Sequence, residues 1–252
     1  HLRLELREAI QQKQFNLFYQ PLVHPSTGRV KGVEALVRWC HPERGYIFPD
    51  VFIPLAERTG QIVAIGQWVV EKACLDIAEW NRQHNTQLTV SVNISPLQFG
   101  RTGFLEGLNY VLEISHLSPE LLKIEITEGV IITGAERTVE ILKSVRALGV
   151  QVAIDDFGTG YSSLAYLTLL PLKKIKIDKS FVFRLPDDRK SIKLLEAIYN
   201  IAKAFQLEAI PEGVENEKQL QILSMIGYKL FQGFFFGKPV PTYEFLKRLT
   251  KE

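Results

Sequence analysis

Strand and helix patterns alternate along this chain from residue 88 onward, and no other feature limits its possible folds as strongly. Six apolar segments are typical of strands: residues 88–93, 121–128, 150–156, 173–178, 207–215 and 228–233. Amphipathic helix patterns follow them, at residues 104–114, 135–148, 189–205, 216–226 and 242–250. This order, without a low-complexity linker, predicts parallel strands wrapped by helices.

The first part of the chain adds two strands to this series. Residues 15–21 and 30–39 flank a short turn rich in proline and glycine, which predicts an antiparallel hairpin. Helix patterns follow at 50–59 and 62–83. The total of eight strands predicts an α/β fold, a modified (β/α)₈ TIM-type barrel with an irregular antiparallel first strand. A doubly wound open sheet is the alternative, but polar strand ends spread over most strands favour the closed barrel.

The length of 252 residues suits one large domain. We expect residues 1–14 to be an N-terminal helix or a linker from a preceding domain, and residues 15–252 to form the domain itself. The chain starts at His1, so we expect an excised piece of a larger protein. Cys40 and Cys74 have no metal-ligand spacing, which favours a reducing, cytoplasmic compartment.

Composition excludes two classes of partner. The formal net charge is only +2, without a dense block of basic residues, so we expect no nucleic acid polymer. No apolar run reaches the roughly 18 residues that a transmembrane helix needs, so we expect no membrane contact by this domain. A membrane anchor could lie elsewhere in the full-length parent.

Polar residues stand near the ends of seven different strand patterns. They are Glu34, Asn93, Glu125, Asp155, Asp156, Lys176, Glu212 and Gln232. In a barrel the carboxyl ends of all strands meet at one mouth, so these side chains would share a site. Each one alone has an ordinary alternative: a carboxylate can cap a helix or pair with a cation, and Asp155–Asp156 can belong to a turn. We expect Phe234, Phe235 and Phe236 to belong to the core.

Several carboxylates at close quarters raise one another's pKa unless cations are present. Oxygen ligands without cysteine or clustered histidine select Mg²⁺ or Mn²⁺. The adjacent Asp155 and Asp156 suit a site with two metals, which favours hydrolysis of a phosphate ester.

The same residues resemble a known family. Glu34-Ala-Leu36, within Val33-Glu-Ala-Leu-Val-Arg-Trp39, is similar to the signature of the EAL domains, bacterial phosphodiesterases of cyclic di-GMP. Further similar blocks start at Phe52, Asn93, Glu125, Asp155, Lys176, Glu212 and Gln232. The resemblance covers about residues 15–241 and implies a barrel with an irregular antiparallel start.

The resemblance also implies roles for individual residues. The metal ligands for two Mg²⁺ or Mn²⁺ ions would be Glu34, Asn93, Glu125, Asp155, Asp156 and Glu212. The catalytic residues would be Lys176, which holds the nucleophilic water, together with Glu212 and Glu34. The substrate contacts would be Gln20, Leu36, Arg38, Asp178, Pro211, Glu215 and Gln232. Glu128 would anchor a regulatory loop that includes Phe157, Gly158, Thr159, Gly160 and Ser162.

The implied activity is metal-dependent hydrolysis of cyclic di-GMP to linear 5′-pGpG in bacterial signalling and biofilm control. The implied partners are a second copy of the chain, in a homodimer, and an N-terminal sensor or cyclase domain. Two alternatives stay open: a catalytically silent cyclic di-GMP receptor, and a barrel used only for protein contacts. Pro211 and Leu97 depart from the family pattern, in which alanine and arginine are frequent, but neither departure removes a metal ligand.

Overall fold

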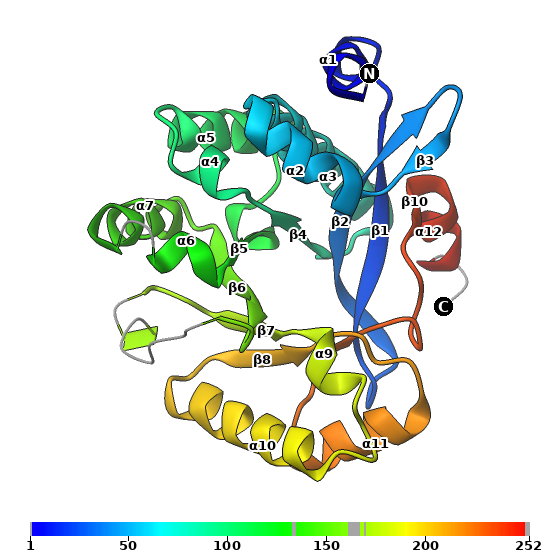
Figure 1. Ribbon diagram of the computed structural model, residues 1–252, viewed down its shortest axis with the longest axis vertical. Helices are drawn as coiled ribbons and strands as arrows, with labels where there is room; N and C mark the ends of the chain where they lie inside the picture. The colour runs from blue at the N-terminus through cyan, green and yellow to red at the C-terminus, as the bar shows by residue number, and fades with distance from the viewer. Residues whose placement is uncertain (1, 133–134, 161–166, 169, 250–252) are drawn as a thin grey trace.

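The computed structural model describes residues 2–132, 135–160, 167–168 and 170–249. Figure 1 shows a curved sheet that turns back on itself, with helices on its outside. The strands are β1 (Phe15–His24), β2 (Arg29–His41), β3 (Gly45–Ile47), β4 (Thr89–Asn93), β5 (Leu122–Thr127), β6 (Gln151–Phe157), β7 (Lys174–Ile177), β8 (Glu208–Pro211), β9 (Phe231–Gln232) and β10 (Val240–Pro241).

The sheet has the strand order β10-β1-β2-β4-β5-β6-β7-β8. All pairs from β2–β4 to β7–β8 are parallel, whereas β1 is antiparallel to β2, β9 and β10. Just after β8, Val214 donates its N–H to the carbonyl of Gln232 in β9 at 3.1 Å, and this bond brings the sheet almost to closure. The predicted modified barrel with an antiparallel first strand is therefore confirmed, and the doubly wound open sheet is wrong.

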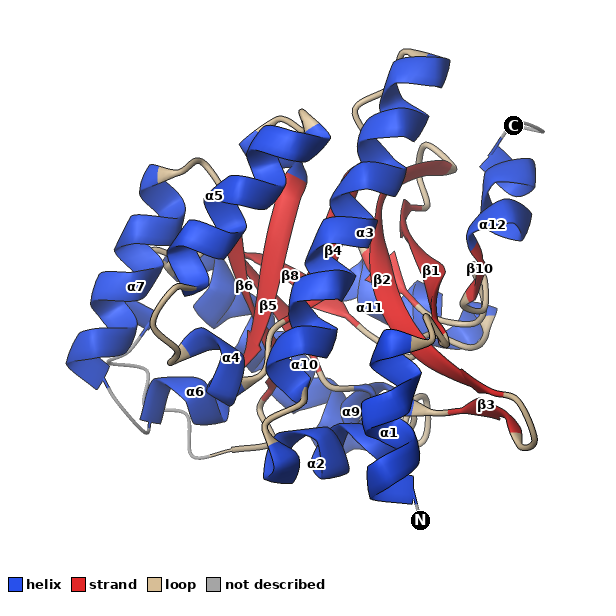
Figure 2. Cartoon of the chain, turned by 90° about the horizontal axis from the view of Figure 1, so that it is seen from above, coloured by secondary structure: helices blue, strands red, loops and turns tan. Residues whose placement is uncertain are grey.

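The helices lie outside the sheet or at one end of it. They are α1 (Leu2–Gln11), α2 (Pro49–Thr59), α3 (Ile62–His84), α4 (Pro96–Phe99), α5 (Phe104–Ser115), α6 (Glu128–Ile132), α7 (Ala135–Ala147), α9 (Lys179–Val182), α10 (Arg189–Ala204), α11 (Glu217–Ile226) and α12 (Thr242–Leu249), with a 3₁₀ turn at Pro119–Leu121. The short helices α4, α6 and α9 follow the carboxyl ends of their strands and lie together at one end of the barrel (Figure 2). This end is the mouth.

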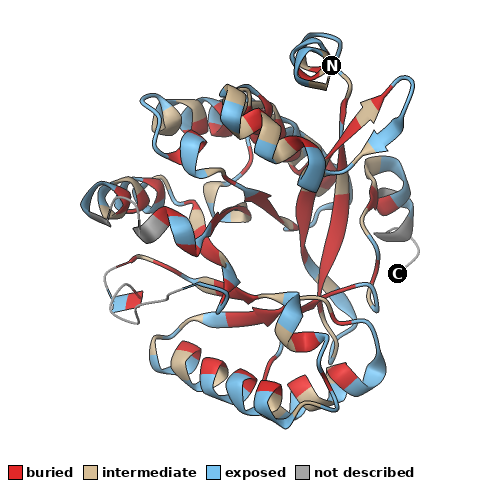
Figure 3. Cartoon of the chain, viewed as in Figure 1, coloured by how far each residue is buried: buried red, intermediate tan, exposed pale blue. Residues whose placement is uncertain are grey.

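Side-chain alternation along the strands separates an apolar layer from a polar interior. In β5, Ile124 and Ile126 belong to the main hydrophobic cluster, which packs between the sheet and the helices. Glu125, which lies between them, points the other way, as expected for a repeat of two residues. Ile175 and Ile177 flank Lys176 of β7 in the same manner. Figure 3 shows the buried residues along the strands and on the inner faces of the helices.

The N-terminal helix α1 packs on the domain. Leu6 and Ala9 are fully buried and belong to the main hydrophobic cluster. The boundary predicted at residue 14 stays a prediction. None of the helices in the described residues is long and apolar enough to cross a membrane.

Some elements differ from the sequence prediction. Strands β3 and β10 were missed because their two or three residues are too short to produce a period. Phe234 and Phe235 are 53% and 45% exposed, so the expectation that the three phenylalanines are core residues is wrong for both.

Candidate active site

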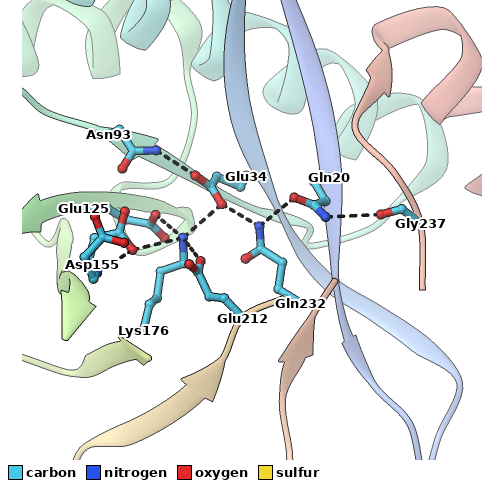
Figure 4. Close-up of polar contacts among 10 residues, drawn as sticks. Gln20, Glu34, Asn93, Glu125, Asp155, Lys176, Glu212, Gln232 and Gly237 are labelled. Carbon is cyan, nitrogen blue, oxygen red and sulfur yellow. Dashed lines mark hydrogen bonds and ion pairs between the residues drawn. The ribbon is translucent and has the colours of Figure 1, made fainter. Parts of the chain in front are cut away.

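Lys176 of β7 lies at the centre of the polar interior. Its Nζ is 2.9 Å from Glu34 Oε2, 2.7 Å from Glu125 Oε2 and 2.6 Å from Glu212 Oε1, with Asp155 Oδ1 at 3.6 Å (Figure 4). These four carboxylates come from β2, β5 and β6 and from the residue after β8. One buried ammonium group therefore joins four strands of the barrel.

Glu34 of β2 is held by three donors. Its Oε1 accepts a hydrogen bond from Asn93 Nδ2 at 2.7 Å, and its Oε2 accepts from Gln232 Nε2 at 2.5 Å as well as from Lys176. Gln232 also donates to Gln20 Oε1 at 3.2 Å, and Gln20 donates to the carbonyl of Gly237 at 3.3 Å. This row of hydrogen bonds, visible in Figure 4, links β4, β2, β9 and β1 across the barrel.

A β-bulge places two consecutive acids together. Consecutive residues of a regular strand point to opposite faces. However, β6 advances three residues, from Ile154 to Phe157, while its neighbour β7 advances two, so β6 carries one extra residue. Asp156 has a φ of 54°, an uncommon value outside glycine, and its N–H donates to Asp155 Oδ1 at 3.0 Å. The bulge lets both carboxylates face the mouth.

Three of the six predicted metal ligands form a compact group. Asp155, Asp156 and Glu212 each offer a carboxylate oxygen, and these oxygens lie within 4.8 Å of one another. Glu34 and Glu125 lie outside this group, and like Glu212 each directs an oxygen at Lys176 Nζ. The donor set is entirely oxygen, as hard divalent cations require, and the group therefore fits such a cation.

The pKa values of the acids reflect crowding and burial. Burial raises the pKa of Glu125 to about 7, with Glu34 and Asp155 adding to the rise and Lys176 opposing it. Burial also raises the pKa of Glu212 well above its usual value, against the effect of Lys176. For Glu34 the attraction of Lys176, together with its hydrogen bonds, outweighs burial and lowers the pKa. Full ionisation of all four acids would place more negative charge here than one lysine neutralises, and a bound divalent cation would offset that charge.

Burial, Asp155 and Asp178 together raise the pKa of Asp156 to about 6. Burial has the opposite effect on Lys176: it lowers the pKa of the ammonium group, but the surrounding carboxylates outweigh it and raise that pKa well above the usual value. Lys176 is therefore a permanent cation in this site.

A cleft of about 310 Å³ opens above Lys176. Four predicted substrate contacts line it: Gln20, Leu36, Glu215 and Gln232. The sequence reasoning missed five further lining residues: Lys179, Phe183, Gly213, Gly233 and Phe234. Only glycine fits at position 213, because φ is 71° and an added Cβ would lie 2.5 Å from Lys179 Cβ. The glycine itself was therefore the one sequence signal for this part of the cleft.

Three predicted substrate contacts are not among the residues that line the cleft. Asp178 caps α9 by accepting from the N–H of Ser180 at 3.0 Å, and it lies close enough to Asp156 to raise its pKa. Pro211 is the buried last residue of β8, opposite Ile177. Arg38 lies two residues beyond the cleft-lining Leu36, on the same face of β2.

Glu128 binds the segment that follows β6. Its Oε1 accepts from the N–H of Gly158 at 2.8 Å, and its Oε2 accepts from the N–H of Gly160 at 3.1 Å. Thr159 donates to the carbonyl of Asp156 at 2.9 Å. Phe157, placed in the loop by sequence, is instead the buried last residue of β6. Ser162, the last residue of the predicted regulatory loop, lies outside the described residues.

We expect Gly160→Ala to weaken this attachment. An added Cβ would lie 2.5 Å from Glu128 Oε2, so the carboxylate or the loop has to move. Because a displacement of about 1 Å near reacting groups can cost about 100-fold in rate, we expect a loss of turnover of about 10- to 100-fold. Steady-state kinetics measures it. Gly100→Ala is the control, since its Cβ would make only an ordinary contact with Pro96 at 3.4 Å. Equal losses in both variants would contradict the prediction.

The barrel with one antiparallel strand, and the acids gathered around a buried lysine at its mouth, define the class: a TIM-like barrel with an acidic, cation-binding type of site. Residues 3–239 match the EAL domain family, and the chain belongs to this family.

Two curated relatives from Pseudomonas aeruginosa have the same domain. The bifunctional diguanylate cyclase/cyclic di-GMP phosphodiesterase MucR is 40% identical over 242 residues, 96% of this chain and 35% of MucR. The cyclic di-GMP phosphodiesterase NbdA is 39% identical over 237 residues, 94% of this chain and 30% of NbdA. The chain thus spans about a third of the length of these relatives.

Solved structures agree with the sequence match. A structure described as PaMucR phosphodiesterase in a c-di-GMP complex has a TM-score of 0.94 at 39% identity, covering 97% of this chain and 100% of that one. The EAL enzyme Bd1971, in its form bound to cAMP and cyclic di-GMP, has a TM-score of 0.93 at 36% identity, covering 98% of this chain and 68% of that one.

Proposed function

We propose that this domain hydrolyses cyclic di-GMP to linear 5′-pGpG with the help of two divalent cations, Mg²⁺ or Mn²⁺. The observation that carries the proposal is the convergence of the strand-end residues. Glu34, Glu125, Asp155 and Glu212 surround Lys176, and Asn93 and Gln232 hold Glu34. The activities named for MucR and NbdA support the choice of substrate.

The residues proposed to hold the cations are Glu34, Asn93, Glu125, Asp155, Asp156 and Glu212. The oxygens of Asp155, Asp156 and Glu212, within 4.8 Å of one another, support this assignment. When bound, the cations would lower the pKa of water and neutralise charge on the phosphate.

The chain's own residues would orient the reaction. Lys176, with its ammonium facing four carboxylates, would hold a water molecule and offset charge on the phosphate. Burial raises the pKa of Glu212, and a bound cation would offset this rise, so that the ionised Glu212 would accept a proton from that water. The water oxygen attacks phosphorus as the bond to the 3′ oxygen breaks; the proton taken up by Glu212 then passes to the departing 3′ oxygen, which leaves a free 3′ hydroxyl and a 5′ phosphate. Gln20, Leu36, Glu215 and Gln232 would contact the substrate in the cleft, and Asp178 and Pro211 would support its wall.

The deciding experiment is to incubate the purified domain with cyclic di-GMP and Mg²⁺ or Mn²⁺ and to separate the products by chromatography. We expect 5′-pGpG as the product and no turnover when a chelator is present. Binding of cyclic di-GMP without any product, at protein concentrations well above those of contaminants, would instead assign the domain as a receptor.

We expect Asp156→Asn to weaken binding of the cation, and this effect can be measured in the absence of substrate. Ligand at about 100 times its dissociation constant stabilises a fold by about 2.7 kcal/mol, which raises the melting temperature of a domain this large by about 5–10 °C. Chelator-treated wild type should show this shift on addition of Mn²⁺, and Asp156→Asn less than half of it. Asp187→Asn, an exposed acid that is not among the cleft-lining residues, should keep the full shift. A full shift in Asp156→Asn would remove this residue from the ligand set.

The proposal also covers the other domains of the full-length protein and its oligomeric state. Because the chain spans about a third of its curated relatives, we propose that an N-terminal sensor or cyclase domain precedes it in a longer cytoplasmic or membrane-anchored protein. We also propose that the domain forms a homodimer and that the Glu128-anchored segment is its regulatory loop. Size-exclusion chromatography with light scattering tests the dimer.

A further inference from the structure

Arg38 lies between two aromatic rings at the edge of the barrel mouth. Its guanidinium carbon is 5.5 Å from the centroid of the Phe18 ring and 5.4 Å from that of the Phe48 ring. Nη1 donates to the carbonyl of Val37 at 2.9 Å, and the residue is only 8% exposed. Two aromatic contacts and one hydrogen bond therefore hold the guanidinium in a defined position beside the cleft-lining Leu36.

Phe48 is an unusual residue for its place in the fold. It is the N-cap of α2, with extended backbone angles and no side-chain cap hydrogen bond. Serine, threonine, aspartate and asparagine are preferred at this position because their oxygens bind the free N–H groups of the first turn. Phe48 makes no such bond and leaves 57% of its surface exposed. Helix stability therefore does not explain a phenylalanine here.

A third ring continues the same surface. Tyr46 of β3 packs edge-on against Phe18, with the ring centroids 5.2 Å apart, and it is 47% exposed. β3 pairs with the end of β2, as Figure 1 shows, and sets Tyr46 opposite Cys40. The Phe18 ring thus contacts Tyr46 as well as Arg38. We call Phe18, Tyr46 and Phe48 together the aromatic rim. Tyr46 and Phe48 are exposed, Phe18 is half-buried, and the guanidinium of Arg38 lies against Phe18 and Phe48.

We propose that the aromatic rim binds one purine base of the substrate, with Phe48 as the stacking residue. The inference rests on the proposed function and adds a base-binding surface outside the acidic cleft. Every nucleobase has a π-face that stacks on aromatic side chains. Guanidinium groups form strong, charge-assisted hydrogen bonds with phosphates, so Arg38 suits the phosphate next to a base that stacks on Phe48. With one phosphodiester at Lys176, the purine of a cyclic dinucleotide extends past Leu36 onto Phe48.

Phe48→Ser separates substrate binding from stability. Serine supplies the missing cap, so the melting temperature should stay unchanged or rise. Loss of the stacking ring should raise KM for cyclic di-GMP about 5- to 100-fold, the range that aromatic stacking gives, with kcat within about twofold. Phe48→Trp, which keeps a stacking face, should retain a KM close to that of wild type. The matched control is Tyr110→Ser on α5, which removes a ring with 55% exposure remote from the mouth and should leave KM unchanged.

Equilibrium binding of cyclic di-GMP in the presence of a chelator makes the test independent of turnover. We expect the dissociation constant of Phe48→Ser to rise by the same factor as KM. If wild type binds without hydrolysing, the proposed activity fails, while the comparison of dissociation constants still decides the role of the rim. Equal KM and equal dissociation constants in wild type and Phe48→Ser would overturn the proposal. So would a lower melting temperature with reduced kcat and unchanged KM, which marks a structural residue.

Discussion

Replacement of Lys176 by methionine is expected to abolish turnover while the barrel still folds. The lysine side chain is 3% exposed and contacts four carboxylates, and methionine has a similar length but carries no charge. If Lys176 orients the attacking water, its loss should reduce kcat by about 10²- to 10⁴-fold, the usual contribution of a positioned proton donor or acceptor. Product chromatography with cyclic di-GMP measures the loss.

The same variant should reveal the electrostatic role of the lysine. Breaking a buried ion pair costs about 3–5 kcal/mol because the partner charge is left uncompensated. Burial already raises the pKa of Glu125 to about 7, so this residue can take up a proton and reduce the destabilisation. We therefore expect a lower melting temperature in chelator and a larger rise on addition of Mn²⁺ than in wild type, because the cation replaces the missing ammonium.

Lys176→Arg provides the control for this prediction. It keeps the charge, so its melting temperature in chelator should stay nearer to that of wild type, but the larger guanidinium should not restore turnover. Wild-type turnover in Lys176→Met would contradict the assignment of a catalytic role to this residue.

The barrel could be predicted because its signals are long and periodic. Six strand patterns and their helices each span several residues, and the order of strands and helices admits few topologies. Residues near the carboxyl ends of strands share one mouth in a barrel, so the convergence of Glu34, Glu125 and Lys176 followed from fold class alone.

The parts that sequence could not supply depend on local backbone geometry. The adjacency of Asp155 and Asp156 predicted one shared site, but in a regular strand they would point to opposite faces; the bulge in β6 and the φ of 54° at Asp156 bring them together. The sequence does not mark the bulge, because the residue with positive φ is Asp156 and not the glycine that usually occupies such a position. Phe234 was assigned to the core by its apolar character, but its exposure depends on the turn after β9 and has no periodic signal.

The hydrogen-bond directions around Glu34 likewise come only from the structure, and they give the second large prediction. Asn93, Gln232 and Lys176 all donate to the Glu34 carboxylate, so a glutamine side chain at this position faces donors on both sides. The conflict is relieved only when the amide nitrogen of the introduced glutamine turns toward Asn93 and the Asn93 amide rotates to offer its oxygen. We expect Glu34→Gln to fold in this arrangement with a stability loss of about 1–3 kcal/mol.

We expect Glu34→Gln to reduce the turnover rate far more than it reduces the stability of the fold. The change neutralises one proposed metal ligand and occupies the oxygen of another, Asn93, so we expect a loss of at least about 100-fold in kcat and a smaller Mn²⁺-induced rise in melting temperature. Glu106→Gln, on the outer helix α5, should change neither.

The double variant Glu34→Gln/Asn93→Asp separates hydrogen-bond polarity from ligand position. It exchanges the carboxylate and the amide between the two positions, so the net charge is kept and the carboxylate introduced at position 93 accepts the bond that the amide introduced at position 34 donates. We expect it to recover most of the lost stability, because no donor faces a donor between the two side chains. Turnover should stay low, since the carboxylate no longer lies between Lys176 and Gln232. If turnover recovers along with stability, the site needs only the charge, and the specific role of Glu34 is refuted.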